Sequence, residues 1–239
     1  MTNKPFESPS IQPTDDCQLS SLPTFLPLNS EIFNALVTLN RGSEAIAAVL
    51  HMNDEENRFV RTLDALKVLA EEEKIAIAIV GGLGAIHYGY PAATQDIDVA
   101  IGKDQLERFV IVAPKYGFKI AWNSSSGWHT LMHGDVEVNV VPEGRKAKDN
   151  SPTTIPSPSQ LGVSSGLGYA NLPGWTELKI SSARQKDQAH IVEVLKKCSE
   201  ATIEQVRNHL SVVHESYERL FIQLSDQAVD ERLQEAERR

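Results

Sequence analysis

The stretch IVGGLGAIHYGYPAATQDIDVAI, residues 79–101, decides how this chain of 239 residues is interpreted. An apolar run ends at Gly81 and Gly82, a Tyr-Gly-Tyr-Pro turn follows, and two aspartates then stand one residue apart. The flanking runs KIAIAIV (74–80) and TQDIDVAIG (94–102) predict strands, because they are short, rich in β-branched residues and bounded by turn residues. We therefore expect strand, glycine turn, short helix and strand in this order.

The glycines match neither of the two common phosphate-binding loops. A dinucleotide fingerprint needs G-x-G-x-x-G, and although Gly82 and Gly84 fill the first two positions, His87 stands at the third. The Gly-Lys-Ser/Thr of a Walker loop does not occur in the sequence. What remains is a strand that delivers Gly81 and Gly82 to a helix, where backbone N–H groups can approach a phosphate closely. A plain tight turn is the alternative, and the glycines alone favour it.

Asp96 and Asp98 change that balance. Residues i and i+2 of a strand share a face, so the two carboxylates lie together and repel each other unless a cation lies between them. Mg²⁺ is the expected cation, because it prefers oxygen ligands and binds together with substrate phosphates. Two solvated acids on an exposed strand face are the alternative. The apolar residues Ile97, Val99 and Ile101 form the opposite side, which indicates an interior strand.

The remaining sequence predicts an α/β (α+β) fold with a mixed-sheet core and a helical C-terminal extension. WHTLMHGDVEVNVVPEG (128–144) predicts a hairpin that turns at His133–Gly134, and its second arm alternates polar residues with valines. Further elements are expected as a strand over 118–122 and helices over 31–50, 55–73, 104–117, 174–183, 186–198 and 201–236. The predicted units are a disordered or loosely docked arm (1–30), the core (31–144), a long mobile loop (145–172) and a helical C-terminal region (173–239).

Composition narrows the class of protein. The formal net charge of -9 disfavours a broad electrostatic grip on nucleic acid, which needs a positive surface. The two cysteines, Cys17 and Cys198, support neither a disulfide framework nor a zinc site. No secretory signal and no run of about 20 apolar residues are present, so we expect a soluble, cytoplasmic protein without a membrane partner.

Three blocks of the sequence together resemble the nucleotidyltransferase superfamily with the DNA polymerase β-like fold. The first is the apolar strand, Gly-Gly, short helix, Tyr-Pro and Asp-Ile-Asp of the opening stretch. The second is VEVNVVPEG (136–144), similar to the strand that carries a third carboxylate, and the third is ELKISSARQKDQAHIVEVL (177–195). The match is most similar to small bacterial nucleotidyltransferases related to the AbiEii toxins and covers about residues 74–198.

The resemblance implies roles for individual residues. Asp96 and Asp98 would hold the divalent metal, Mg²⁺ or Mn²⁺, and act in catalysis. The position of the third catalytic carboxylate maps to Asn139, and the arginine common after the Tyr-Pro maps to Ala92. Glu137 is a possible substitute acid, since it lies on the same strand face one pleat repeat away. The residues that would bind the nucleotide are Gly81, Gly82, Thr94, Lys179 and Lys186.

The implied function is Mg²⁺-dependent transfer of a nucleoside monophosphate from an NTP to the hydroxyl of an unknown acceptor, which could be RNA, a protein or a small molecule. A cognate partner protein, as in a toxin–antitoxin or defence pair, is implied only by the resemblance. An amide at residue 139 is no base, so a catalytically degenerate protein that binds a nucleotide or a partner is the alternative.

Some other residues invite functional interpretations that their positions do not favour. His129 and His133 lie too far apart along a strand to share a metal directly. Trp122 and Trp128 flank a Ser-rich turn and could stack on a base, but packing at the edge of the fold is the expected role for both. His87, near the glycine turn, is expected to pack or cap locally.

Overall fold

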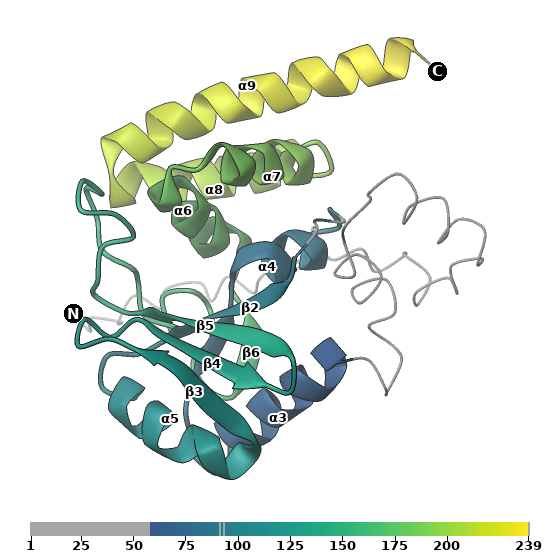
Figure 1. Cartoon of the computed structure of the whole chain (residues 1–239). Helices are drawn as coiled ribbons and strands as arrows, with labels where there is room; N and C mark the ends of the chain where they lie inside the picture. Colours follow the sequence, from purple (N-terminus) through teal and green to yellow (C-terminus); the bar gives the residue numbers. More distant parts are fainter. Residues whose placement is uncertain (1–57, 91, 93, 239) are drawn as a thin grey trace, which may run out of the picture.

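A mixed β-sheet organises the part of the chain that the structure describes. The structure is a computed structural model, and it describes residues 58–90, 92 and 94–238 (Figure 1). Within these residues the sheet has six strands in the order β3-β4-β5-β2-β1-β6. The strands are β1 (Ile77–Ile79), β2 (Asp96–Ile101), β3 (Phe118–Asn123), β4 (His129–His133), β5 (Val136–Pro142) and β6 (Leu167–Tyr169).

The sheet is mixed because local hairpins and longer crossovers both contribute strands. Strands β3, β4 and β5 form an antiparallel meander, and β1 pairs antiparallel with β2. Strand β2 pairs parallel with β5, and β1 pairs parallel with β6, so the central pair β2–β5 joins segments far apart in the sequence. The predicted α/β class with a mixed sheet is therefore confirmed.

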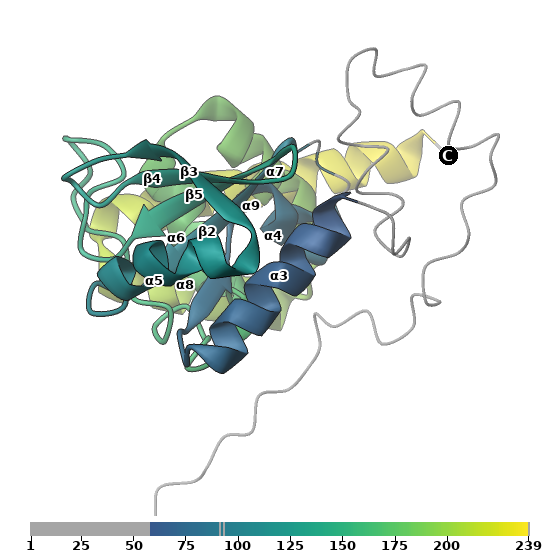
Figure 2. The ribbon, with the colours of Figure 1, turned by 60° about the horizontal axis from the view of Figure 1, so that its bottom comes forward.

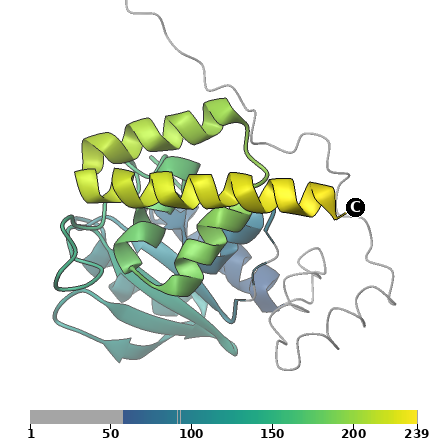
Figure 3. The ribbon, with the colours of Figure 1, turned by 90° about the horizontal axis from the view of Figure 1, so that it is seen from above.

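Helices cover both faces of the sheet. Helices α3 and α5 pack below it around Phe59 and Phe109, and Figure 2 shows both in front of the strands. The 3-10 helix η1 belongs to this lower layer, and the α-helices α4 and α6–α9 lie above the sheet, with α8 and α9 as the outer layer in Figure 3. The helices are α3 (Arg58–Glu72), α4 (Gly81–His87), α5 (Leu106–Val112), the 3-10 helix η1 (Ala113–Tyr116), α6 (Leu172–Ser182), α7 (Gln185–Leu195), α8 (Glu200–Val213) and α9 (Glu215–Glu237). No helix between residues 58 and 238 is both long and apolar enough to cross a membrane.

Two expected elements differ from the structure. The single helix expected over 201–236 is divided at His214, whose backbone is extended and whose side chain caps α9 by accepting from the N–H of Ser216. The segment 145–172, expected to be a loop, contains β6, because Gly166 accepts a hydrogen bond from Ile77 and starts a short parallel pairing at the sheet edge. Patterns of three residues are too short for periodicity to reveal.

The hairpin of β4 and β5 agrees closely with the expectation. Its turn is centred on Gly134 and Asp135, one residue later than expected, and Gly134 has a positive φ of 60°. The valines of β5 are buried or half-buried and its polar residues face away from the lower core, as the alternation predicted. The expected arm (1–30), the expected helix (31–50) and Cys17 lie outside the described residues.

Candidate active site

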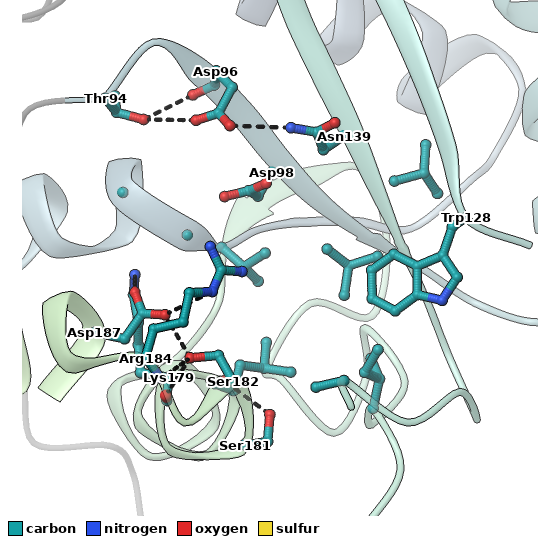
Figure 4. Close-up of a pocket in the computed structure, with 18 of the residues that line it drawn as sticks. Thr94, Asp96, Asp98, Trp128, Asn139, Lys179, Ser181, Ser182, Arg184 and Asp187 are labelled. Atoms are coloured by element: carbon teal, nitrogen blue, oxygen red, sulfur yellow. Dashed lines mark hydrogen bonds and ion pairs between the residues drawn. The ribbon is translucent and has the colours of Figure 1, made fainter. Parts of the chain in front are cut away.

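A pocket of about 610 Å³ lies between the upper face of the sheet and the helices α6 and α7. Residues from the glycine turn, from β2 and β5, and from both helices line it (Figure 4). The predicted site residues that line this pocket are Gly81, Gly82, Thr94, Asp96, Asp98, Asn139, Lys179 and Lys186. The fold therefore brings together residues that lie up to 105 positions apart in the sequence.

Asp96 and Asp98 project from one face of β2 into this pocket, as strand alternation requires. Asp96 is held from two sides. The Thr94 hydroxyl lies 3.1 Å from one carboxylate oxygen, Oδ1, and the Asn139 side-chain amide donates to the other, Oδ2, over 3.1 Å. Asp96 is thus fixed in place before any ligand binds.

Asp98 stands in a different environment. Among the described residues no donor satisfies its carboxylate, and its side chain packs directly over the backbone of Gly81. Burial raises the pKa of Asp98 to about 6, and the adjacent charge of Asp96 adds to this increase. A half-buried carboxylate beside a second carboxylate is an electrostatic environment that a divalent cation would stabilise.

The three glycines of the turn are each required by a close neighbour. Gly81 has a φ of 63°, and a Cβ there would overlap the carboxylate of Asp98. A Cβ on Gly82 would lie 2.7 Å from the hydroxyl of Thr94. A Cβ on Gly84 would overlap the indole of Trp175, which donates a 3.0 Å hydrogen bond to the carbonyl of Gly81. The glycine pattern, which fits neither the dinucleotide fingerprint nor the Walker loop, therefore allows β2 and α6 to approach the turn.

The opposite wall of the pocket carries a buried ion pair. Lys179 Nζ lies 2.6 Å from Asp187 Oδ1, and both side chains are less than a tenth exposed. The Ser182 hydroxyl donates to Asp187 over 2.5 Å, and Arg184 lies 3.5 Å away at the pocket rim. Burial acts to raise the pKa of Asp187, but Lys179, Ser182 and Arg184 outweigh it and hold this pKa below its usual value.

The positive groups of this wall are divided between paired and unpaired ones. His190 is neutral, because burial and the nearby Lys179 lower its pKa to about 4. Lys179 is engaged by Asp187, whereas Lys186 is exposed, lines the pocket and makes no ion pair with another described residue. Lys186 and Arg184, which lies 3.5 Å from Asp187 but has a 61% exposed side chain, are therefore the cations of this wall best placed to meet an anionic ligand.

Asn139, at the position that the resemblance assigns to a third acid, is hydrogen-bonded at both ends of its amide. It pairs in register with Asp98 on the neighbouring strand. Its amide nitrogen must face Asp96, because a carboxylate only accepts, and its oxygen accepts from the Thr130 hydroxyl over 3.0 Å. Asn139 thus orients Asp96, and its amide oxygen already has a hydrogen-bond donor.

Glu137, the possible substitute acid, and Ala92, which stands where the family commonly has an arginine, both lie outside the pocket lining. Glu137 pairs in register with Asp96 on the same sheet face, but it is exposed and does not line the pocket. Ala92 is buried in the upper core, where an arginine would have no room for its charge. Within the described residues no group of three or more His, Cys, Asp or Glu side chains is arranged to hold a metal. A cation here would rely on Asp96 and Asp98.

The histidines noted in the sequence have structural positions. His87 stacks on Tyr169 with ring centroids 4.1 Å apart, which joins α4 to β6. His133 lies 3.0 Å from the hydroxyl of Thr62 in α3, below the sheet. His129 is buried, and its Nδ1 has no partner among the described residues.

Sequence reasoning missed part of the site. Asp187, in the first turn of α7, forms a buried pair with Lys179 that the sequence did not predict. Neither residue carries a local signal for this pair, because they belong to different helices. Trp175 was also missed, although the third glycine at position 84 marks the place where its ring approaches.

Comparisons with known proteins give only distant similarity. No protein-family model and no curated protein matches the sequence. An ANT(2″)-Ia structure in complex with adenylyl-2″-tobramycin is 12% identical over 71% of this chain and 98% of its own, with a TM-score of 0.35. A Thermotoga maritima CCA-adding enzyme complexed with tRNA is 13% identical over 80% and 53%, also at 0.35. An apo CCA-adding enzyme is 13% identical over 77% and 54%, at 0.36. The chain thus spans about half the length of these CCA-adding enzymes.

Proposed function

We propose that this chain is a metal-dependent nucleotidyltransferase that transfers a nucleoside monophosphate from an NTP to an acceptor hydroxyl and releases pyrophosphate. The observation that carries the proposal is the pair Asp96 and Asp98 above the Gly81–Gly82 turn, in a pocket whose far wall is cationic. Two carboxylates favour a divalent cation, and a bare glycine backbone with nearby cations favours phosphate. These are the groups that phosphoryl-type transfer requires.

The residues of the chain divide the work. Asp96 and Asp98 would hold Mg²⁺ or Mn²⁺, which would neutralise charge on the carboxylates and on the phosphates. Lys186 and Arg184 would meet the phosphates that leave as pyrophosphate, while Thr94 and Asn139 keep Asp96 in its orientation. The new P–O bond forms to the acceptor oxygen, the bond between the α-phosphorus and the pyrophosphate oxygen breaks, and the hydroxyl proton must pass to a base.

The identity of that base supports a second candidate function. Asn139 stands where a third acid would accept the proton, and an amide is no base. Glu137, the alternative acid, is exposed and does not line the pocket. General-base assistance is worth about 10²- to 10⁴-fold in rate. These observations favour a catalytically degenerate protein of the same fold, which binds a nucleotide or a partner and transfers slowly or not at all.

A labelling experiment separates the two candidates. The purified chain is incubated with each α-labelled NTP, Mg²⁺ or Mn²⁺, and separate pools of RNA, protein and small-molecule acceptors, and transfer of label is measured. Label in one pool supports the transferase and identifies its acceptor class. Absence of transfer together with metal-dependent NTP binding supports the degenerate protein. If Asp98→Asn changes neither binding nor transfer, the metal site is wrong.

The finer aspects of the proposal come from the sequence resemblance alone. They are a place among small bacterial AbiEii-related proteins and a cognate partner in a toxin–antitoxin or defence pair. Co-expression with the products of neighbouring genes, followed by growth assays of wild type and Asp96→Asn, tests them. Growth arrest by wild type only, relieved by one neighbour, is the expected result for a toxin with an antitoxin.

A further inference from the structure

The two sides of the pocket have unlike chemistry. Figure 4 shows Trp128 on one side and the cluster around Lys179 and Asp187 on the other. Trp122 and Trp128 both line the pocket, from β3 and from the turn that leads into β4. The phosphates of a nucleotide would bind at the cationic side. The aromatic side offers no charge to phosphates and is open to another part of the ligand.

Trp122 lies in one transverse row with the metal-site residues. Pairing across the sheet runs from Asp98 on β2 to Asn139 on β5, to Thr130 on β4 and to Trp122 on β3. Residues paired in register share a face of the sheet, so all four side chains stand on the pocket side. The row spans three strand spacings, about 14 Å between the Cα atoms of its ends.

A β-bulge places Trp122 on that face. The pairs are Ile120 with Leu131 and then Trp122 with Thr130, so Ala121 is an extra residue in β3. Without the extra residue, Trp122 would pair with His129 and point toward the lower core instead. Bulges near functional sites re-aim side chains in this way. The bulge therefore directs an indole toward the pocket.

The indoles are available to a ligand. Trp122 is 54% exposed although it is among the largest apolar side chains, and Trp128 is half-buried. Among the described residues, neither ring stacks on another aromatic ring. The two indole N–H groups are also not among the buried polar groups that lack a hydrogen-bond partner. By contrast, Trp175 is fully buried and hydrogen-bonded to Gly81. Two of the three tryptophans thus face the pocket with open ring surface.

We propose that Trp122 and Trp128 form a stacking platform for a nucleobase, at the side of the pocket opposite the phosphates. The inference rests on the proposed function, because it takes the phosphate position from the Gly81–Gly82 turn and α7. Indole rings stack on any base through its π face, so the platform contributes affinity with little base preference. The base belongs either to the bound NTP or to a nucleoside-bearing acceptor.

Matched ligands test the platform. Calorimetry in Mg²⁺ measures binding of an NTP and of inorganic tripolyphosphate to wild type, Trp122→Ala and Trp128→Ala. We expect the NTP affinity to fall about 5- to 150-fold in at least one tryptophan variant, while the tripolyphosphate affinity stays within about twofold. Trp→Phe variants at the same positions should retain most of the NTP affinity. Ile111→Ala, which removes a 66% exposed apolar side chain from α5, is the matched control and should change neither affinity.

A second arm assigns the source of the base. A nucleoside without phosphates is titrated into protein already saturated with NTP. If the nucleoside binds to wild type but not to the tryptophan variants, the platform holds the base of an acceptor. If the nucleoside does not bind, and the tryptophan variants have lost NTP affinity, the platform holds the base of the NTP.

Two results separate the failure of this inference from that of the proposed function. If wild type binds both ligands and the tryptophan variants bind both equally well, the platform is wrong, and a role such as partner docking replaces it. If wild type binds neither ligand in Mg²⁺ or Mn²⁺, the proposed function is wrong and the platform falls with it.

Discussion

Two aspartates face the same pocket in opposite electrostatic environments. Asp187 is buried beside Lys179 and accepts from Ser182, and its pKa lies below the usual value. Asp98 is partly buried beside Asp96, no described residue donates to its carboxylate, and its pKa rises to about 6. The charges of the wall formed by α6 and α7 thus balance one another, whereas the two negative charges on β2 are balanced only when a cation binds.

The largest effect on stability is expected when the buried ion pair of Lys179 and Asp187 is broken. Asp187→Asn leaves the Lys179 ammonium buried without its counter-charge, and loss of one partner of a buried pair destabilises by about 3–5 kcal/mol. Urea denaturation at pH 7.5 measures the change. The double variant Lys179→Met/Asp187→Leu removes both charges and should recover most of the stability. A loss below about 1 kcal/mol in the single variant would show that solvent reaches the pair.

A change of the opposite sign is expected at Asp98. Its folded pKa of about 6 lies above the unfolded value, so the ionised form destabilises the fold above pH 6 and this penalty disappears as pH falls toward 4. Asp98→Asn should therefore stabilise the metal-free protein by up to about 3 kcal/mol at pH 8 and by almost nothing near pH 4. Equal stability of variant and wild type at pH 8 would contradict the raised pKa.

A third carboxylate beside Asp96 and Asp98 should lower the stability of the metal-free protein and increase its dependence on a cation. Asn139→Asp places an acid in register with Asp98 and beside Asp96, so we expect about 1–3 kcal/mol lower stability without metal. Mg²⁺ should restore this loss. If the missing base limits the reaction, transfer of label should increase by about 10²- to 10⁴-fold. Lower stability that Mg²⁺ does not restore would mean that the three side chains fail to share a cation.

The smallest effect is expected at Glu137, an acid on the same sheet face that lies outside the pocket lining. Glu137→Gln should change stability by less than about 0.5 kcal/mol, as is usual for exposed positions. The rate of transfer should change by less than about threefold, since this side chain is exposed and does not line the pocket. A loss of 100-fold or more would instead identify Glu137 as the substitute third acid.

The sequence predicts the β2 wall well because its information is local. Alternation in DIDVAI places Asp96 and Asp98 on one face, and the same alternation in β5 places Asn139 with them. Only the parallel pairing of β2 with β5, which no local pattern encodes, makes the two strands neighbours. The resemblance implied a third-carboxylate position at Asn139, but the sequence did not predict this pairing.

The other features depend on how neighbouring elements pack or pair, which the periodicity of the sequence does not encode. The pair of Lys179 and Asp187 requires a specific packing of α6 against α7, and the position of Trp122 requires one extra residue in β3. A bulge of this kind leaves no periodic signal, because a shift of one residue only exchanges the two faces of a strand. Strand β6 was missed for a related reason, since its three residues gain their structure from β1.

The central claim is that Asp96 and Asp98 require a divalent cation and that an NTP binds with it. Calorimetry of NTP binding at pH 7.5, in Mg²⁺ and in EDTA, for wild type and Asp98→Asn, tests it most directly. We predict that wild type binds at least about tenfold more tightly in Mg²⁺, and that Asp98→Asn binds equally weakly in both conditions. Equal wild-type affinity with and without the metal would contradict the claim.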